Sequence, residues 1–159
     1  MSLIELVAAT AILATVMTSV VVLVRSGYGV WNAYEQDIEI NENSYGLLRH
    51  VVRQLRQADA ITAISAPSDT AGYLSFVTPS GTTRSWTYSG GQVLFDNGIG
   101  NQLAAQSIDE LVFVGYDAAG NPTTTPEDIQ RVRCTTEVTL SQGGGVPKTV
   151  SVTAWIRSW

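Results

Sequence analysis

A single carboxylate stands at the edge of a long apolar segment near the start of the chain. From Leu6 to Val24 the sequence contains no charged side chain, and Glu5 immediately precedes this run. About 20 apolar residues, with a rise of 1.5 Å each, cross the hydrocarbon core of a bilayer as a helix. Hydroxyl groups inside the run can bond to backbone carbonyls of the same helix, and they belong to Thr10, Thr15, Thr18 and Ser19. The segment is therefore predicted to be a helix that can lie in lipid.

Glu5 has two interpretations that are compatible with each other. An ionised carboxylate near hydrocarbon costs a few kcal/mol and is usually paired or functional. If Met1 is the mature terminus, Glu5 can neutralise the α-amine of a neighbouring copy, so that burial of both charges depends on assembly. The second interpretation is a capping box, in which Ser2 caps the helix and Glu5, three residues on, bonds back to the Ser2 amide.

The stretch Ser2-Leu3-Ile4-Glu5-Leu6, with the apolar run that follows it, resembles the mature N-terminus of type IV pilins and type II secretion pseudopilins. The resemblance implies that a prepilin peptidase removes a leader ending in Gly and that Met1 is then N-methylated. It also implies that Glu5 registers each subunit against its neighbour during assembly. Phenylalanine is usual at the place of Met1, which leaves open that Met1 is an initiator methionine.

The family commonly has a proline where this chain has Val22. Without that helix breaker, the segment from about Leu3 to Val24 is predicted to stay mostly helical in the assembled state. The run has no basic leader before it and no small-residue cleavage site after it, so a retained anchor is expected rather than a secretory signal. Arg25 would then lie at the far headgroup level.

The helical pattern continues after Gly27. Apolar residues recur at heptad-like positions, one row being Trp31, Ile38, Tyr45 and Val52, and its partner row Tyr34, Leu48 and Leu55. One helix from Met1 to about Ala60 is predicted, with a length of roughly 90 Å. No single small domain can cover that length, so lipid or other copies must cover the first half. Bending is expected at the Gly27/Gly29 pair, with Gly46 as a further weak point.

A charged stripe accompanies the second half of this helix in steps of three or four residues, passing through Gly46 between its two halves. It is first acidic and then basic, and it consists of Glu35, Glu39, Glu42, Arg49, Arg53 and Arg56. One interpretation is a solvated flank, in which surface pairs contribute a few tenths of a kcal/mol each. The other is that axially staggered copies place the acidic half of one subunit against the basic half of the next. Such pairing would set register more than affinity.

After Asp69 the pattern changes to the period of two that is typical of strands. Three short strands with turns between them predict an antiparallel meander: Tyr73–Val77, Thr82–Tyr88 and Gln92–Phe95. Further strands are expected at Glu110–Tyr116, Arg131–Leu140 and Thr149–Trp155. The fold class is therefore α+β, one long helix packed on an antiparallel sheet. The expected organisation is a membrane or filament-core helix (1–26), its amphipathic continuation (27–60) and a β-sheet head (61–159).

The net charge and the small number of reactive side chains argue against several functions. The chain has 159 residues and a net charge of -5, which disfavours nucleic-acid binding because no basic excess exists to neutralise phosphates. With a single cysteine, Cys134, and a single histidine, His50, no zinc or haem spacing is possible. Cys134 is expected as a small strand residue and His50 as a packed or solvated side chain. No acid, base or metal constellation suggests an enzyme, and no cofactor is expected.

Polar loops and tryptophans have ordinary structural interpretations. Asp96-Asn97-Gly98 and the segment Asp117–Asn121 are expected to form turns, because neither fits a 12-residue calcium loop. Since related major pseudopilins bind calcium in head loops, the resemblance keeps a cation site near Glu127 and Asp128 as an alternative. No Asn in the chain fits the glycosylation pattern. The aromatic residues expected in the sheet and core are Trp86, Trp155 and Trp159.

Three pieces of the chain resemble the J-type minor pseudopilin and its pilus-system relatives: Arg53–Ala58, Thr87–Leu94 and Val112–Gly120. This likeness implies a tip or priming subunit. The broader resemblance implies a structural subunit stored in the inner membrane and then assembled into an extracellular filament or a periplasmic pseudopilus. Its partners would be copies of itself, related pilins, the inner-membrane assembly machinery, the prepilin peptidase, and lipid before assembly.

A different class of function uses the same parts. In a monomeric membrane-anchored binding module, the apolar helix is an ordinary tether and the head captures a ligand. Glu5 discriminates between the two, because a tether gains nothing from an acid at that depth. N-methylation of Met1 is the observation that would separate them.

Overall fold

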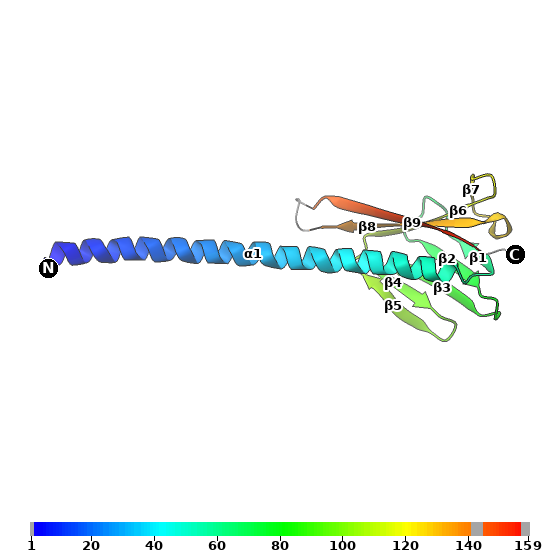
Figure 1. Ribbon diagram of the computed structural model, residues 1–159, viewed down its shortest axis with the longest axis horizontal. Coiled ribbons are helices and arrows are strands. Elements are labelled where there is room, and N and C mark those ends of the chain that lie inside the picture. Colours follow the sequence, from blue (N-terminus) through cyan, green and yellow to red (C-terminus); the bar gives the residue numbers. More distant parts are fainter. Residues whose placement is uncertain (1, 141–144, 157–159) are drawn as a thin grey trace. The chain divides into compact units, whose positions relative to one another are not determined.

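The computed structural model describes residues 2–140 and 145–156 and consists of one long helix and two antiparallel sheets (Figure 1). Helix α1 spans Leu3–Leu55. The chain forms two compact units, residues 1–36 and residues 37–159. The predicted α+β class is confirmed, since the part of α1 in the second unit packs on antiparallel strands.

In the first unit, residues 3–36 form an uninterrupted stretch of α1 whose side chains are exposed, except for Ala33, which is half-buried. Its most apolar 18-residue window has a mean hydropathy of 2.4 and no buried residue, so the helix is long and apolar enough to cross a membrane. The hydroxyls of Thr10, Thr15, Thr18 and Ser19 donate to backbone carbonyls three or four residues earlier, at 2.8–3.0 Å. These polar groups therefore need no partner outside the helix. The segment Leu3–Val24 is helical in the single chain, and its helicity in an assembled state stays a prediction.

Helix α1 is continuous through Gly27, Gly29 and Gly46, so the glycines do not interrupt its hydrogen bonding. It ends at Leu55, before the expected end at Ala60. The last turn tightens, as the amides of Gln57 and Ala58 donate to carbonyls only three residues earlier. The next segment, Ala60–Ile64, is strand β1. The prediction of helix up to Ala60 was wrong because pairing with a strand overrides local helix propensity there.

The first sheet contains strands β1 to β5 in sequence order. After β1 come β2 (Tyr73–Val77), β3 (Thr83–Ser89), β4 (Gln92–Asp96) and β5 (Asn101–Gln106), all antiparallel. The turn between β3 and β4 has φ of 57° at Gly90 and 82° at Gly91, a conformation that glycine adopts without steric penalty. The predicted meander is confirmed, whereas β1 and β5 were not predicted.

The second sheet has the order β7-β6-β8-β9, which makes β9 an edge strand. Its members are β6 (Glu110–Tyr116), β7 (Pro122–Thr123), β8 (Arg131–Thr139) and β9 (Pro147–Trp155), with a short 3-10 helix η1 (Pro126–Asp128) before β8. The two sheets meet where the Gly72 amide donates to the Leu111 carbonyl at 2.8 Å. A Cβ at Gly72 would lie 2.5 Å from that oxygen, so this junction requires glycine.

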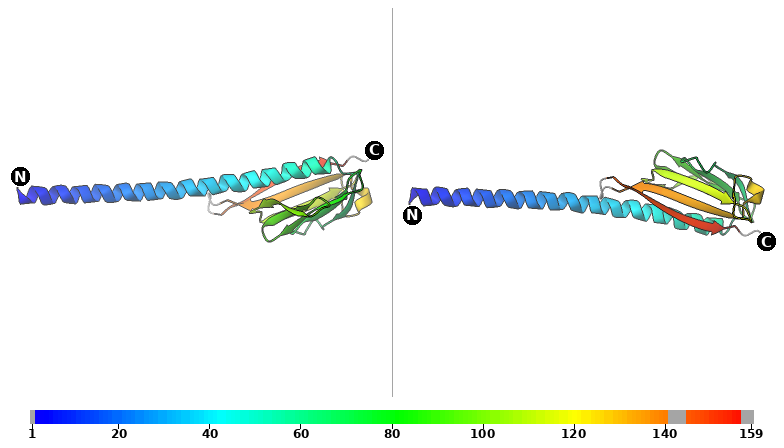
Figure 2. Two further views of the ribbon diagram at one scale, coloured as in Figure 1. Left: turned by 90° about the horizontal axis from the view of Figure 1, so that it is seen from below. Right: turned by 90° about the horizontal axis from the view of Figure 1, so that it is seen from above.

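In the second unit α1 lies against the sheets (Figure 2), and one of its faces contributes to the hydrophobic core. The buried apolar residues of the helix are Leu47, Leu48, Val51 and Leu55. They pack with buried side chains of both sheets, the largest being Phe76, Trp86, Leu111 and Phe113. The predicted apolar rows are only partly right. Leu48 and Leu55 are buried and Val52 is half-buried, but Ile38 is 42% and Tyr45 44% exposed.

Polar side chains of the same helix face reach both sheets. Toward the second sheet, the buried hydroxyls of Ser44 and Thr136 are 2.7 Å apart, and Lys148 donates to Asn41 at 2.8 Å. Toward the first sheet, the Arg84 guanidinium donates to Gln54 Oε1 at 2.6 Å. The helix therefore holds the two sheets by hydrogen bonds as well as by apolar packing.

The buried Ser44–Thr136 pair gives a test of this arrangement. We expect Ser44→Ala to lower the free energy of unfolding of the head by about 1–3 kcal/mol, because it leaves the Thr136 hydroxyl buried with a poor partner. That partner is the Val150 carbonyl at 3.5 Å. Adding Thr136→Val should recover part of the loss, since no unpaired hydroxyl then remains. Urea unfolding of the single and double variants measures this, and losses that simply add would contradict it.

Candidate functional site

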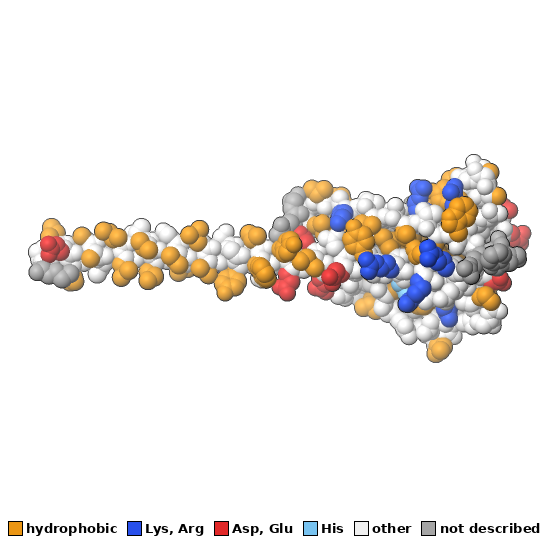
Figure 3. Space-filling model, viewed as in Figure 1, with side chains coloured by type: hydrophobic (Ala, Val, Ile, Leu, Met, Phe, Trp, Pro, Cys, Tyr) orange, Lys and Arg blue, Asp and Glu red, His pale blue; other side chains and the backbone are white. Residues whose placement is uncertain are grey.

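The helix start has the geometry of a capping box. The Ser2 amide donates to Glu5 Oε2 at 2.8 Å, and the Glu5 amide lies 3.4 Å from Ser2 Oγ. This prediction is confirmed. Beyond Glu5, the face of α1 seen in Figure 3 carries hydrophobic and uncharged side chains up to the acidic cluster further along the helix. Met1 lies outside the described residues, so the pairing of Glu5 with an α-amine stays a prediction.

The charged stripe consists of exposed side chains: Glu35, Glu39, Glu42, Arg49, Arg53 and Arg56. Within the part of the chain that the structure describes, these six make no salt bridge. Their spacing repeats, since the glutamates and the arginines each follow one another by four and then three residues. The charges of this stripe are therefore available to an outside partner.

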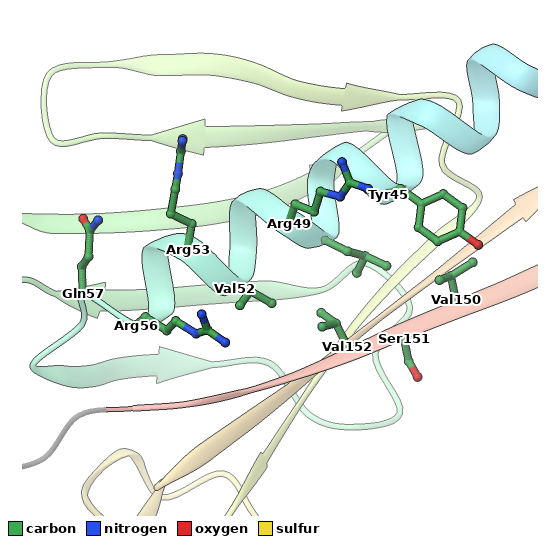
Figure 4. A pocket seen from close by; sticks show the side chains of 10 residues that line it. Tyr45, Arg49, Val52, Arg53, Arg56, Gln57, Val150, Ser151 and Val152 are labelled. Carbon is green, nitrogen blue, oxygen red and sulfur yellow. The ribbon is translucent and has the colours of Figure 1, made fainter.

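A groove of about 670 Å³ lies between α1 and the edge strand β9 (Figure 4). Its lining residues are Tyr45, Leu48, Arg49, Val52, Arg53, Arg56, Gln57, Val150, Ser151 and Val152. Val52, Val150 and Val152 point toward one another across it, whereas Arg53 points away from β9. The groove thus has an apolar floor and a basic rim on the helix side.

The groove joins residues that sequence reasoning did not bring together. The arginines were predicted as half of a stripe, but their position beside Val150 and Val152 was missed. The signal in the sequence was the alternation of β9, in which Lys148, Val150, Val152 and Ala154 share one face. What the sequence lacked was the pairing order that makes β9 the edge next to α1.

His50 lies on the other side of the arginines, in a second hollow of about 200 Å³ that it shares with Gly46, Arg49 and Arg53. Its ring packs edge-on against Phe95, with centroids 4.6 Å apart, and Trp86 Nε1 donates to Nδ1 at 3.4 Å. Burial, together with the charges of Arg53 and Arg84, lowers the pKa of His50 below its ordinary value. Of the two expectations for His50, a packed or a solvated side chain, the structure shows the packed one, with the residue half-buried.

We expect acid to weaken the head through His50. Because its pKa is lowered in the folded state, the unfolded chain binds more protons between that lowered value and about 6.5, and stability falls as pH drops through this window. His50→Asn keeps an acceptor for Trp86 but cannot titrate. Urea unfolding of the full chain in detergent at pH 7.5, 6.5, 5.5 and 4.5 should show a steeper loss for the wild type. Equal pH slopes would contradict the assignment.

The other candidate residues have structural roles. Burial raises the pKa of the Cys134 thiol, and Cys134 is a fully buried residue of β8, as expected for a small strand residue. Asp96 and Asp117 accept turn amides from Gly98 at 2.8 Å and from Asn121 at 2.7 Å. The hydrogen bonds from Asn121 are the main cause that lowers the pKa of Asp117. Both loops are therefore turns, as predicted.

The predictions for the cation site and the tryptophans have mixed outcomes. Among the residues described, no three His, Cys, Asp or Glu side chains gather as they would around a metal, and Glu127 and Asp128 lie in η1. Trp86 is fully buried, as predicted, but Trp155 is 62% exposed, with the Arg131 guanidinium 5.5 Å from its ring centre. It faces outward because alternate residues of an edge strand face solvent. Trp159 lies outside the described residues.

The chain was also compared with known proteins. No family model matches it, and no curated protein matches its sequence. The features of the chain that bear on its function are a capped apolar helix, a charged helix stripe, and a basic groove beside an edge strand.

Proposed function

We propose that this protein is a structural subunit of a type IV pilus-like filament, held in the inner membrane by the first part of α1 and then assembled by bundling of these helices. The observation that carries the proposal is the apolar surface of α1, which is exposed on all sides after a single acidic residue, Glu5. Such a surface must be covered by lipid or by protein. In a filament subunit, lipid covers the helix before assembly, and the helices of other subunits cover it afterwards.

The position of the acid supports assembly over a simple tether. Glu5 already forms the capping box with Ser2, but a capping box can also be made with Gln. The negative charge is thus not needed for the cap, and it disfavours insertion into hydrocarbon. Pairing with the α-amine of a neighbouring copy would compensate the charge of the Glu5 carboxylate in the assembly. A monomeric anchored binding module remains the rival.

The second candidate is a minor pseudopilin at the tip of a type II secretion pseudopilus. The support for this candidate is the resemblance of Thr87–Leu94 and Val112–Gly120 to the head of the J-type minor pseudopilin. In the structure the first piece makes most of the β3–β4 hairpin, and the second begins within β6. Abundance separates the candidates, because a principal subunit dominates the filament by mass and a tip subunit does not.

The test is to express the chain, preceded by a leader ending in Gly, with an inner-membrane assembly machinery and prepilin peptidase, and to image filaments sheared from the cells. Mass spectrometry of the filaments should find this chain as the main component, with an N-methylated terminus at Met1. If this chain is found only in trace amounts, in filaments made mainly of another subunit, the result would favour the role of a tip subunit. A chain that stays monomeric in the membrane and unmethylated would contradict both and favour the binding module.

A further inference from the structure

We propose that the groove between α1 and β9 receives the helix of a second copy of this chain, through the segment 31–42. The inference rests on the proposed function, since it names the surfaces by which neighbouring subunits meet. The helix side of the groove presents a row that we call the groove stripe: Tyr45, Arg49, Val52 and Arg56. The segment of the second copy presents a row that we call the acidic stripe: Trp31, Glu35, Ile38 and Glu42.

The two stripes have the same spacing. Each residue of the groove stripe comes 14 residues after its counterpart in the acidic stripe. Fourteen residues of helix correspond to about 21 Å of rise. Two heptads drift by only about 40° around a straight helix, so both stripes occupy nearly the same helical face. A parallel copy that presents this face to the groove, shifted by about 21 Å, therefore aligns the two stripes along their whole length.

The aligned residues are complementary in chemistry. Arg49 meets Glu35 and Arg56 meets Glu42, while Val52 meets Ile38. All four charged side chains are exposed, and within the described residues none is in a salt bridge. The apolar partners are also open to contact, with Trp31 67% and Ile38 42% exposed. Docking would cover these apolar side chains and pair the charges at the edge of the contact, where they are screened less than free surface pairs.

The floor of the groove has room for the apolar side chains of a partner helix. Val150 and Val152 of β9 are half-buried and face Val52 across a groove of about 670 Å³. A helix surface that alternates apolar and acidic side chains fits a floor of valines with arginines along one rim. The charge pattern argues for another copy of this chain, because the segment that complements the groove stripe lies on the same helix.

The axial shift has a consequence for assembly. The contact joins two different surfaces, the groove of one copy and the acidic stripe of the next, and is therefore heterologous. With a shift along the helix axis it cannot close into a ring, so each added copy offers a new groove or a new acidic stripe. The contact extends into a filament, as the proposed function requires.

Cysteine cross-linking of the full chain in membranes tests this register. Ile38→Cys is placed in chains with one tag and Val52→Cys in chains with a tag of another size, and the two are co-expressed and mildly oxidised. We expect a mixed disulfide dimer at a yield at least several-fold above the control pair. Native Cys134 does not interfere, because it is buried with a raised pKa.

The matched control pairs Ile38→Cys with Tyr45→Cys, which lie in the same apolar row but only one heptad apart. A second test pair, Glu42→Cys with Arg56→Cys, uses exposed positions and so avoids any risk to folding from the half-buried Val52. It has the same 14-residue offset and should also form the mixed dimer. A disulfide requires that the two Cα atoms lie within about 7 Å of each other. The pairs that cross-link therefore report the axial register of the two helices without imaging.

Several outcomes would overturn the proposal. They are absence of mixed dimers from both test pairs, equal yield from the control pair, or homodimers of the Ile38→Cys chain as the main product. Protection of Val52→Cys from maleimide without any dimer would mean that another molecule occupies the groove. If filaments form without these cross-links, only the groove assignment fails. If the cross-links form without filaments, the contact stands and the filament function fails.

Discussion

Glu5→Ala should leave the protein stably inserted in the membrane but reduce its incorporation into filaments by more than a hundredfold. Removing one partner of a buried charge pair leaves the other charge uncompensated, which costs about 3–5 kcal/mol, and every 1.4 kcal/mol is a factor of ten in an equilibrium. The head is unaffected, because the hydrogen bonds of Glu5 are with Ser2. The measurements are the amount of chain in the membrane and in sheared filaments.

The capping box requires a control, because Glu5→Ala also removes the bond to the Ser2 amide. Loss of a cap costs only about 0.5–2 kcal/mol. Glu5→Gln keeps a side chain that can make the capping box and removes only the charge. We expect the Glu5→Gln variant to be incorporated into filaments almost as poorly as the Glu5→Ala variant. Normal filament yield from Glu5→Gln would assign the residue to the cap alone and remove the argument for charge pairing.

Reversing the charge of Arg53 should impair assembly, and adding Glu39→Arg should partly restore it. Glu39 and Arg53 are 14 residues apart on α1, so the same shift of about 21 Å brings them to the same axial level in neighbouring copies. Arg53→Glu replaces an attraction by a repulsion, each up to about 1 kcal/mol at an exposed site. Subunit addition should weaken about fivefold or more, and wild-type filaments should loosen at high salt.

Filament yield from the single and double variants measures this effect. Arg133→Glu serves as the matched control, because it makes the same charge change at an exposed arginine of β8, away from α1. Heads should remain folded in all variants, as shown by near-ultraviolet circular dichroism. Normal assembly of Arg53→Glu, or no rescue by Glu39→Arg despite folded heads, would mean that the stripe is only a solvated flank.

Strands with a strong period of two could be predicted from the sequence almost to the residue, as Tyr73–Val77 and Glu110–Tyr116 illustrate. Strand β5 was missed because its residues, Asn101–Gln106, are mostly polar or Ala, which have low strand propensity. It is an edge strand held by pairing with β4. Strand β1 was missed for a related reason, since Ala58 and Ala60 favour helix locally and only the partner strand β2 decides otherwise.

The helix faces were harder to predict than the helix itself. Apolar residues cover more than one face of α1, and periodicity alone does not tell which of them meets the head. Leu47 and Val51 are fully buried although neither belonged to the predicted rows, and Ile38 and Tyr45 of those rows are exposed. The capping box was predictable because its two residues are three apart in sequence. The groove was not, because β9 follows Val52 by about a hundred residues.

The bonding of α1 to both sheets also determines how the head responds to force. A pull on α1 along its axis enters the head through Asn41, Ser44 and Gln54, whose hydrogen bonds go to Lys148, Thr136 and Arg84. These bonds lie along one stretch of helix and would be strained together rather than one after another. Because their partners lie on different sheets, the helix cannot slide past one sheet without dragging the other. A pulling force on α1 is thus distributed over both sheets of the head and does not separate one strand at a time from its sheet.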